Sequence, residues 1–225
     1  MTMRKTIVCL ANSRKNAHRC VAGIEFPSPN SHRWIRPIGD RDGHGVSGQE
    51  IALDNGAQPQ PLDVLEIGLT EWRPEGHQQE NYLLDANTPW RWLGQLAWLD
   101  AIQLPMSQEP LWVNGSSTFR GLNDRIIVSA ETAVTDSLRL IRSQVTICVS
   151  NPYDPERLLE VRASFQHAGE GYRLKVTDPT VENMFRPRGV GQYPIGDAIL
   201  TISLGEEWQG ELYKLVAAVV AAPPV

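Results

Sequence analysis

Residues 6–38 of the chain, TIVCLANSRKNAHRCVAGIEFPSPNSHRWIRPI, contain three short runs of β-favouring residues separated by polar turns. The first run, residues 6–11, stops at the polar stretch NSRKN, and the second, residues 18–26, stops at the turn-forming stretch PSPN. In the third run, residues 33–38, polar and apolar side chains alternate as in a strand with one buried face. This stretch therefore predicts three short strands at the start of the protein.

Strand patterns continue through the rest of the chain. After residues 39–61, which are rich in Gly, Asp, Gln and Pro, the pattern resumes at residues 62–70. Further strands are predicted at residues 137–149, 158–166, 172–177, 197–204 and 212–220, and the turn HAGEG joins the second and third of these into a hairpin. We expect a mainly β protein with two small β-barrels, formed by residues 1–130 and 131–225.

One α-helix is predicted at residues 88–104. Thr88 has the side chain of an N-cap, Pro89 suits the first helical position, and the pattern ends before Pro105. Trp and Leu side chains cover two faces of this segment. We therefore expect the helix to be largely buried and its aromatic residues to belong to the core.

Basic residues are concentrated at the N-terminus of an acidic protein. Residues 1–41 contain eight Lys or Arg against two acids, a formal charge of +6, whereas residues 42–225 contain 13 Lys or Arg against 24 acids, or −11. The acidic part of the molecule repels polyanions. This pattern indicates a localised anionic partner rather than general adhesion to polyanions.

The composition indicates a folded cytoplasmic protein. Apolar residues make up 41% of the chain and charged residues 21%, which is ordinary for such proteins. The apolar run at residues 7–11 is too short for a signal sequence, and no stretch approaches the length of a membrane-spanning helix. Cys9, Cys20 and Cys148 lack any C-x-x-C spacing, so neither a disulfide framework nor a thiolate zinc site is predicted.

Several strings along the chain combine into a family resemblance. They are IVCLANSRK at residues 7–15, RCVAGI at 19–24, WIRP at 34–37 and YKLVAA at 213–218. Together they resemble the prokaryotic dual OB-containing domain family over nearly the whole chain. The resemblance implies two OB-type barrels and a role in nucleic-acid transactions, within a multi-gene bacterial or phage-defence cluster. Its motifs are structural strings, and no active site is carried over.

The first 41 residues supply the two components with which OB barrels bind single strands, a basic groove and aromatic side chains for base stacking. The candidate contacts are Arg14, Lys15, Arg19, Arg33, Trp34 and Arg36. We expect Arg36 to contact a phosphate or a base, beside Trp34 as a stacking platform. In the alternative, Trp34 packs in the core and the arginines pair with acids elsewhere.

A second candidate site is the loop FRPRGVGQY at residues 185–193. Its glycines allow the backbone to approach an anion closely, Arg186 and Arg188 add positive charge, and Phe185 or Tyr193 offers a ring for stacking. The loop lacks the Gly-Lys-Ser/Thr of a P-loop and the dinucleotide-binding fingerprint. The alternative is a plain connection between strands.

No cofactor, metal site or catalytic residue is predicted. His18 and Cys20 share a strand face, and His77 and Glu80 have helical spacing, but neither pair has further ligands nearby. Residues 40–44, DRDGH, resemble a calcium loop at their start, yet residue 51 is Ile where the bidentate acid belongs. Covalent catalysis by Cys20 or Ser13 would need an aligned base, and His18 on the same strand is incorrectly aimed.

The leading functional hypothesis is a non-enzymatic module that binds nucleic acid, as a single strand or within a larger complex, chiefly through its N-terminal barrel. The first alternative is a protein-interaction subunit whose barrels dock other members of an assembly. The second alternative is a metal-dependent nuclease or hydrolase that uses His77, Glu80 and acids from residues 39–61.

Overall fold

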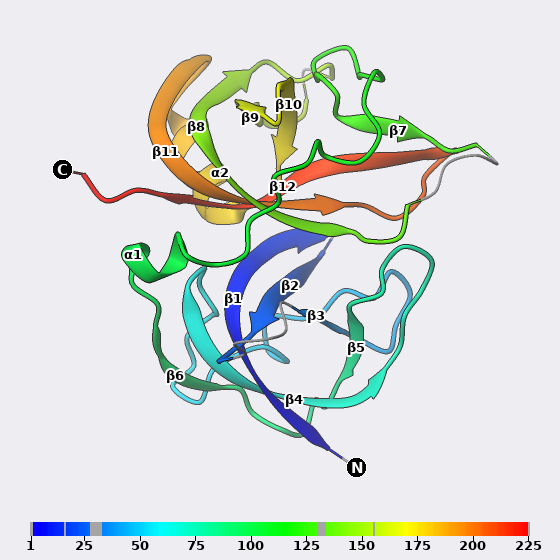
Figure 1. Ribbon diagram of the computed structural model, residues 1–225, viewed down its shortest axis with the longest axis vertical. Coiled ribbons are helices and arrows are strands. Elements are labelled where there is room, and N and C mark those ends of the chain that lie inside the picture. Colours follow the sequence, from blue (N-terminus) through cyan, green and yellow to red (C-terminus); the bar gives the residue numbers. More distant parts are fainter. Residues whose placement is uncertain (1, 16, 28–32, 130–133, 155, 225) are drawn as a thin grey trace. The chain divides into compact units, whose positions relative to one another are not determined.

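Two compact units make up the computed structural model, and each is built around a β-barrel (Figure 1). The structure describes residues 2–15, 17–27, 33–129, 134–154 and 156–224. The units are Met1–Pro105 and Met106–Val225. No helix among the described residues is long and apolar enough to cross a membrane.

The strands of the first unit include the four that the sequence predicts. Within the described residues they are β1 (Met3–Lys15), β2 (His18–Glu25), β3 (Trp34–Ile38), β4 (Asp63–Trp72), β5 (Asn81–Leu84) and β6 (Arg91–Gln95). β1 runs through most of the predicted turn NSRKN, because its pairing with β2 continues as far as Lys15 opposite His18. Asn16, and residues 28–30 of the next predicted turn, lie outside the described residues.

The order of these strands closes the sheet into a barrel. β1 pairs with β2 and β4, β2 pairs with β3, and β5 pairs with β3 and β4. All of these pairs are antiparallel except β3 and β5, which are parallel. The cyclic order β1–β2–β3–β5–β4 with one parallel pair is the topology of the OB fold.

Inward-facing side chains from β1, β2, β3, β4 and β5 fill the first barrel. They are Ile7, Cys9, Val21, Ile35, Leu65, Ile67, Leu69, Tyr82 and Leu84. The connection between β3 and β4, predicted as a long loop, contributes Val46, Ile51 and Leu53 to the same core. This connection is therefore packed against the barrel, because burying its apolar side chains stabilises the loop.

The predicted helix at residues 88–104 is wrong. Its first half forms β6, which pairs with β4 so that Val64 lies opposite Gly94 and Leu65 opposite Trp92. Gly94 has a φ of 153°, which no helix contains. The edge of β4 needs hydrogen-bond partners for its backbone, and that requirement outweighs the helical propensity of the segment.

The burial expected for this segment is correct for some of its residues. Trp90 is fully buried in the first barrel, but Leu93 is 48% exposed and Leu99 72% exposed. Thr88, predicted as an N-cap, instead donates its hydroxyl to the carboxylate of Asp85 at 2.9 Å. The segment ends in a single helical turn, α1 (Trp98–Ala101).

The second unit contains all the strands predicted beyond residue 130. Within the described residues its strands are β7 (Arg125–Ile127), β8 (Leu138–Ser150), β9 (Glu160–His167), β10 (Glu170–Val176), β11 (Gly191–Leu204) and β12 (Glu211–Ala221). β8 pairs with β9 and β11, β9 with β10, and β12 with β10 and β11. β10 and β12 are parallel, so the OB topology is repeated.

A helix that the sequence analysis missed closes one end of the second barrel. α2 (Pro179–Phe185) connects β10 to β11 and places Val181 and Phe185 in the core. Asp178 is its N-cap, accepting hydrogen bonds from the N–H groups of Thr180 and Val181, and Pro179 occupies the first turn. A short 3₁₀ helix, η1 (Arg186–Arg188), follows. A mainly β fold with a buried helix is therefore correct, but that helix is α2 and not the one predicted at residues 88–104.

The second unit begins earlier than the boundary predicted at residue 130, which itself lies outside the described residues. Leu111 belongs to the core of the second barrel, and its N–H donates to the hydroxyl of Tyr172 at 3.0 Å. Leu122 pairs with Arg173 of β10, and β7 pairs with β12. These contacts fill the space where β10 and β12 diverge, so the segment before residue 130 is part of the second barrel.

Candidate nucleic-acid interface

An OB barrel contacts ligands with the outer surface of its second and third strands and with the loops flanking that surface. In the first barrel these strands are β2 and β3, and the described residues of the flanking loops are 17 and 73–80. In the second barrel they are β9 and β10, and the described residues of the flanking loops are 151–154, 156–159 and 205–210. The side chains at these two surfaces decide what each barrel can bind.

Three predicted site residues meet at the hairpin between β1 and β2. Arg14 lies directly opposite Arg19, and Lys15 lies opposite His18. Arg14 is exposed, whereas Lys15 and Arg19 are half-buried. Like charges at facing positions of two strands repel each other. This hairpin gathers three basic side chains at one end of β2.

Arg33 and Trp34 lie at the other end of β2. Trp34 is half-buried and pairs with Ile24, which is about 17 Å along the strand from Arg19 at the usual rise per residue. Arg33 is exposed and donates to the hydroxyl of Tyr82 at 3.4 Å. The structure thus divides the predicted N-terminal patch into two separate places.

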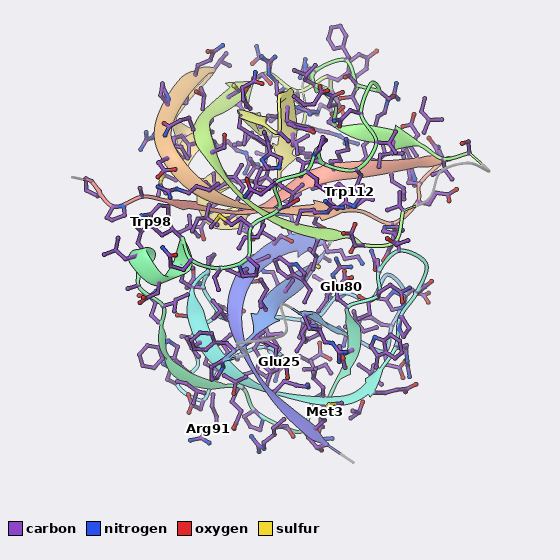
Figure 2. All side chains as sticks on the ribbon, in the orientation of Figure 1. Met3, Glu25, Glu80, Arg91, Trp98 and Trp112 are labelled. Carbon is purple, nitrogen blue, oxygen red and sulfur yellow. The ribbon has the colours of Figure 1, made fainter. Side chains whose placement is uncertain are left out.

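Arg36 is enclosed by the first barrel. Its Nη2 lies 2.7 Å from Oε1 of Glu80, and both side chains are buried. Glu80, labelled in Figure 2, immediately precedes β5, and its carbonyl accepts the N–H of Arg36 at 2.8 Å. Arg36 is therefore corrected from a ligand contact to a buried structural residue, because a carboxylate already holds its guanidinium.

Several other N-terminal cations are also neutralised locally. Among the described residues, Arg4, Lys5 and Arg41 form ion pairs with Glu66, Glu25 and Glu50, respectively. Glu50 in turn accepts the N–H of Ser47, and its pKa is lowered: burial acts to raise it, but the hydrogen bonds from Ser47 and the charge of Arg41 outweigh burial. The formal charge of +6 thus overstates what this segment offers to a partner.

In the second candidate loop, Phe185 and Arg186 have structural roles. Phe185 is buried in the core of the second barrel and offers no face to a base. Arg186 donates from Nε to the carbonyl of Leu159 at 3.0 Å, and its Nη2 lies 2.5 Å from Oε1 of Glu182. Both predictions are corrected, because these side chains hold α2 against the barrel.

Of the same predicted loop, Arg188 ends η1 and is exposed, whereas Tyr193 lies on β11, where it pairs with Ile147 of β8. The guanidinium of exposed Arg188 lies 4.6 Å from the centroid of the Phe185 ring and 5.8 Å from that of Tyr193. Tyr193 is half-buried, and its hydroxyl is within hydrogen-bond distance of the carbonyls of Arg188 (2.8 Å) and Gly189 (3.0 Å). Arg188 keeps its charge at the surface, while Tyr193 supports the loop.

Two cations that the sequence analysis did not select lie on the outer face of β10. Tyr172, Leu174 and Val176 point into the core, so Arg173 and Lys175 between them point outward, and both are exposed. Neither forms an ion pair with another described residue. The strict alternation of this strand in the sequence was the signal that could have found them.

The neighbouring positions of β9 complete this surface. Ser164 lies opposite Arg173, and Arg162 lies opposite Lys175. Arg162 is buried, with Nη1 3.0 Å from Oδ2 of Asp124 and Nε 3.4 Å from Oε2 of Glu160. Two carboxylates thus neutralise Arg162, and the exposed positive charge of the face comes from β10.

The electrostatic influence of this face extends to β8. Cys148 of β8 lies opposite Arg162 in the β8–β9 pairing. Burial raises the pKa of the Cys148 thiol, whereas the positive charge of Arg173 acts to lower it. The thiol is therefore protonated at neutral pH and is not an activated nucleophile.

Exposed aromatic side chains flank the β9–β10 face. Tyr153, in the loop between β8 and β9, is 89% exposed, and Trp208, in the loop between β11 and β12, is 60% exposed. The Trp208 ring centroid lies 6.3 Å from that of Tyr213. Proteins that bind single strands combine exposed cations with exposed aromatic rings, and both kinds of side chain occur on this face and in its two flanking loops.

The family model for the dual OB-containing domain matches residues 5–219 of the chain. The chain belongs to the dual OB-containing domain family. A search of the curated proteins finds no match. The two repeats of OB topology agree with this membership, and the resemblance expected from the sequence strings is confirmed.

The residues considered for metal binding are not gathered in this dual OB-containing domain protein. Within the described ranges, no three His, Cys, Asp or Glu side chains lie where they could hold one ion. His77 lies in the turn between β4 and β5 rather than on a helix, and Glu80 is paired with Arg36. Asp40, at the start of the calcium-like stretch, pairs with Arg73 at 2.8 Å.

Proposed function

We propose that this dual OB-containing domain protein binds single-stranded nucleic acid without acting on it chemically, chiefly through the outer face of β9 and β10. The observation that carries the proposal is the pair Arg173 and Lys175, exposed on the third strand of an OB barrel. They share one face and are separated by about 7 Å along the strand. Two such cations can follow the backbone of one bound strand.

Each component of this face has a physical role in binding. Arg173 and Lys175 attract phosphates and release counterions from the nucleic acid. Tyr153 and Trp208 offer exposed rings, and each stacked base contributes about 1–3 kcal/mol. Ser164 and Gln166 on the outer side of β9 add hydrogen-bonding groups. Because these contacts use features common to all bases and phosphates, we expect binding with little sequence preference.

The first barrel contributes a smaller contact in this proposal. On its corresponding face, Ala22 and Ile24 are buried and Arg36 is held by Glu80. The hairpin beside this face carries exposed Arg14 opposite half-buried Arg19. We therefore assign the main site to the second barrel, in contrast to the N-terminal site expected from the sequence.

A protein-docking role is the second candidate, and β6 favours it. Trp92 and Leu93 of this strand are both about half exposed. Exposed apolar side chains on a strand are a common means of contacting another protein. Such docking would place the module within a larger nucleoprotein assembly, including the defence clusters that the family resemblance implies.

The test compares oligonucleotide binding by the full-length protein and the Arg173→Ala/Lys175→Ala variant, measured by fluorescence anisotropy. Each phosphate contact raises the logarithm of affinity by about 0.7 for every tenfold decrease in salt concentration. If both side chains contact phosphates, the variant loses about 1.4 log units between 1 M and 0.1 M salt. Its affinity for a single strand at 0.1 M salt is then roughly 25-fold lower than that of wild type. Both side chains are exposed, so folding should be unaffected.

The matched control is Arg4→Ala/Arg91→Ala. It removes the same charge from two exposed arginines that both pair with Glu66 of the first barrel. We expect less than a twofold change in affinity. Equal weakening by both double variants would show that net charge alone governs binding, and unchanged binding by the β10 variant would refute the proposed site. Partners that remain bound after nuclease treatment would favour protein docking.

A further inference from the structure

Phe119 is the most exposed large apolar side chain among the described residues, at 93%. A phenylalanine ring gains about 1.5–3 kcal/mol when it leaves water, so a fully exposed ring is an unused source of binding energy. Isolated apolar residues at a surface are common and need no explanation. The structure around Phe119 is what distinguishes it from them.

The loop that carries Phe119, residues 115–124, is held by a dense set of hydrogen bonds. Asp124 accepts the N–H of Thr118 at 2.7 Å and its hydroxyl at 2.6 Å. The side-chain oxygen of Asn123 accepts the N–H of Gly115 at 2.8 Å. The backbone N–H of Asn123 donates to Oγ of Ser117 at 2.9 Å. The loop is therefore rigid before any ligand binds.

Gly121 shows how closely this loop is packed. A Cβ atom at this position would lie 1.8 Å from Oδ2 of Asp124, the oxygen that also contacts Arg162 of β9. No side chain larger than hydrogen fits while that carboxylate keeps its position. The turn that follows Phe119 thus requires glycine, and the conformation presenting the ring is fixed by the sequence.

Contacts on both sides of Phe119 anchor it at the cationic face. Thr118 is bonded to Asp124, which pairs with Arg162, and Arg120 Nη1 lies 3.9 Å from Oε2 of Glu160. Further along the loop, Leu122 exchanges two backbone hydrogen bonds with Arg173, at 3.2 and 3.0 Å. The ring therefore projects from a support that is bonded to both β9 and β10.

We propose that Phe119 is a stacking platform for one nucleobase of the strand bound at the β9–β10 face, presented by the rigid loop of residues 115–124. This inference rests on the proposed function. Charge favours a nucleobase over a peptide as the occupant, because Arg173 and Lys175 beside the loop complement phosphates attached to that base. A rigid loop binds without paying ordering entropy.

The experiment measures single-strand binding by full-length Phe119→Ala, Phe119→Tyr and wild type over a salt series. We expect Phe119→Ala to bind roughly five- to hundredfold more weakly, with an unchanged slope of affinity against salt, because a ring and not a charge is lost. Phe119→Tyr should bind within about twofold of wild type, since it retains the ring. Leu99→Ala, which removes another exposed apolar side chain, is the matched control.

The outcomes separate this inference from the proposed function. If Phe119→Ala binds like wild type while Arg173→Ala/Lys175→Ala is weakened, the stacking inference is refuted and the proposed function stands. If neither variant is weakened although wild type binds, both are refuted. If Phe119→Ala and Phe119→Tyr both lose single-strand affinity to the same extent, the inference is also refuted, because Phe119→Tyr retains the ring. Thermal unfolding of each variant shows whether a loss of affinity reflects a loss of folding.

Discussion

At the scale of single residues, the ion pair of Arg36 and Glu80 is the clearest case of charge used for structure. Both side chains are buried in the first barrel, and their nearest atoms are 2.7 Å apart. Removing one partner of such a pair leaves an uncompensated charge in a medium of low polarity. The pair therefore holds β3 to the residue that precedes β5.

We predict that Arg36→Ala lowers the free energy of unfolding by about 3–5 kcal/mol, the usual cost of breaking a buried ion pair from one side. Urea denaturation followed by circular dichroism measures this change. Arg33→Ala, at an exposed position nearby, should change stability by less than about 0.5 kcal/mol. A stable Arg36→Ala protein with impaired oligonucleotide binding would restore Arg36 as a ligand contact.

Lys214 is a second buried charge, in the second barrel. Its Nζ donates to the carbonyl of Val113 and to Oδ1 of Asn114, both at 2.7 Å, and lies 5.6 Å from the centroid of the Tyr172 ring. Burial lowers the pKa of Lys214 to about 8, although Asp124 and Glu170 act to raise it. The side chain thus connects β12 to the segment that begins the second unit.

This lowered pKa predicts a pH dependence of stability. Between about 8 and the ordinary value of 10.5, the unfolded chain holds a proton at Lys214 that the folded chain has lost. The contribution of this group to stability therefore rises with pH over that window, by at most about 1.4 kcal/mol per pH unit. Below pH 8 the contribution is constant.

The measurement is the free energy of unfolding of wild type minus that of Lys214→Met, from pH 7 to 10.5. We expect this difference to become more positive as the pH rises above 8, because Lys214 titrates in wild type and the variant lacks that group. A difference that is flat over the whole range would mean that the pKa of Lys214 is not lowered.

Residue placement could be predicted from the sequence where it follows from local alternation. Arg173 and Lys175 alternate with Tyr172, Leu174 and Val176, so their outward direction is encoded within the strand itself. The burial of Arg36 could not be predicted in this way. Its partner Glu80 is distant along the chain, and the two meet because β3 pairs with β5.

At the scale of elements, most strands follow from local sequence signals, whereas the helices are not predicted correctly from such signals. β2, β3, β8, β9, β10 and β12 lie close to their predicted positions, because turn residues and alternation are local signals. β11 begins at Gly191, six residues before its predicted start and within the predicted loop of residues 185–193. Residues 91–95 have helix-favouring neighbours but form β6, since β4 supplies an unpaired edge. α2 has a clear N-terminal signal in Asp178 and Pro179, yet its shortness hides the helical period.

The N-cap of α2 provides a prediction at this scale. Asp178 accepts the N–H groups of Thr180 at 2.9 Å and Val219 at 3.3 Å, so it joins α2 to β12. Asp178→Ala should lower the free energy of unfolding by about 1–2 kcal/mol, and Asp178→Asn, which keeps a capping oxygen, by less. Thermal denaturation of the two variants checks this. Equal stability of Asp178→Ala and wild type would contradict the capping role.

At the scale of the whole molecule, the division between Pro105 and Met106 defines what each unit needs in order to fold. The second barrel includes Leu111 in its core and pairs β7 with β12. It also requires Val113 and Asn114 as acceptors for the buried ammonium of Lys214. A barrel that begins at residue 131 would lack all of these partners.

We predict that a fragment of residues 106–225 folds alone and that a fragment of residues 131–225 does not. The shorter fragment loses a core side chain and leaves a buried charge without acceptors, each of which costs several kcal/mol of a stability that is small in total. Cooperative thermal unfolding is the readout. Equally cooperative unfolding of both fragments would place the boundary near residue 130.

The charge of the molecule is arranged to limit binding to confined sites. The protein carries a net charge of −5, and several of its N-terminal cations are paired with carboxylates. Arg173 and Lys175 are exposed on β10, and Arg14 is exposed at the β1–β2 hairpin. For the proposed function, such a surface would suit a short stretch of single strand better than the coating of a long polyanion.

The β9–β10 site is tested most directly by the slope of the logarithm of single-strand affinity against the logarithm of salt concentration, for wild type and Arg173→Ala/Lys175→Ala. Each phosphate contact contributes about 0.7 to that slope, so we predict that the slope of the double variant is flatter by about 1.4. The slope of Arg4→Ala/Arg91→Ala should match that of wild type. A slope that is the same for wild type and the β10 variant, or an affinity of wild type that does not depend on salt, would contradict the assignment of the β9–β10 face as the nucleic-acid site.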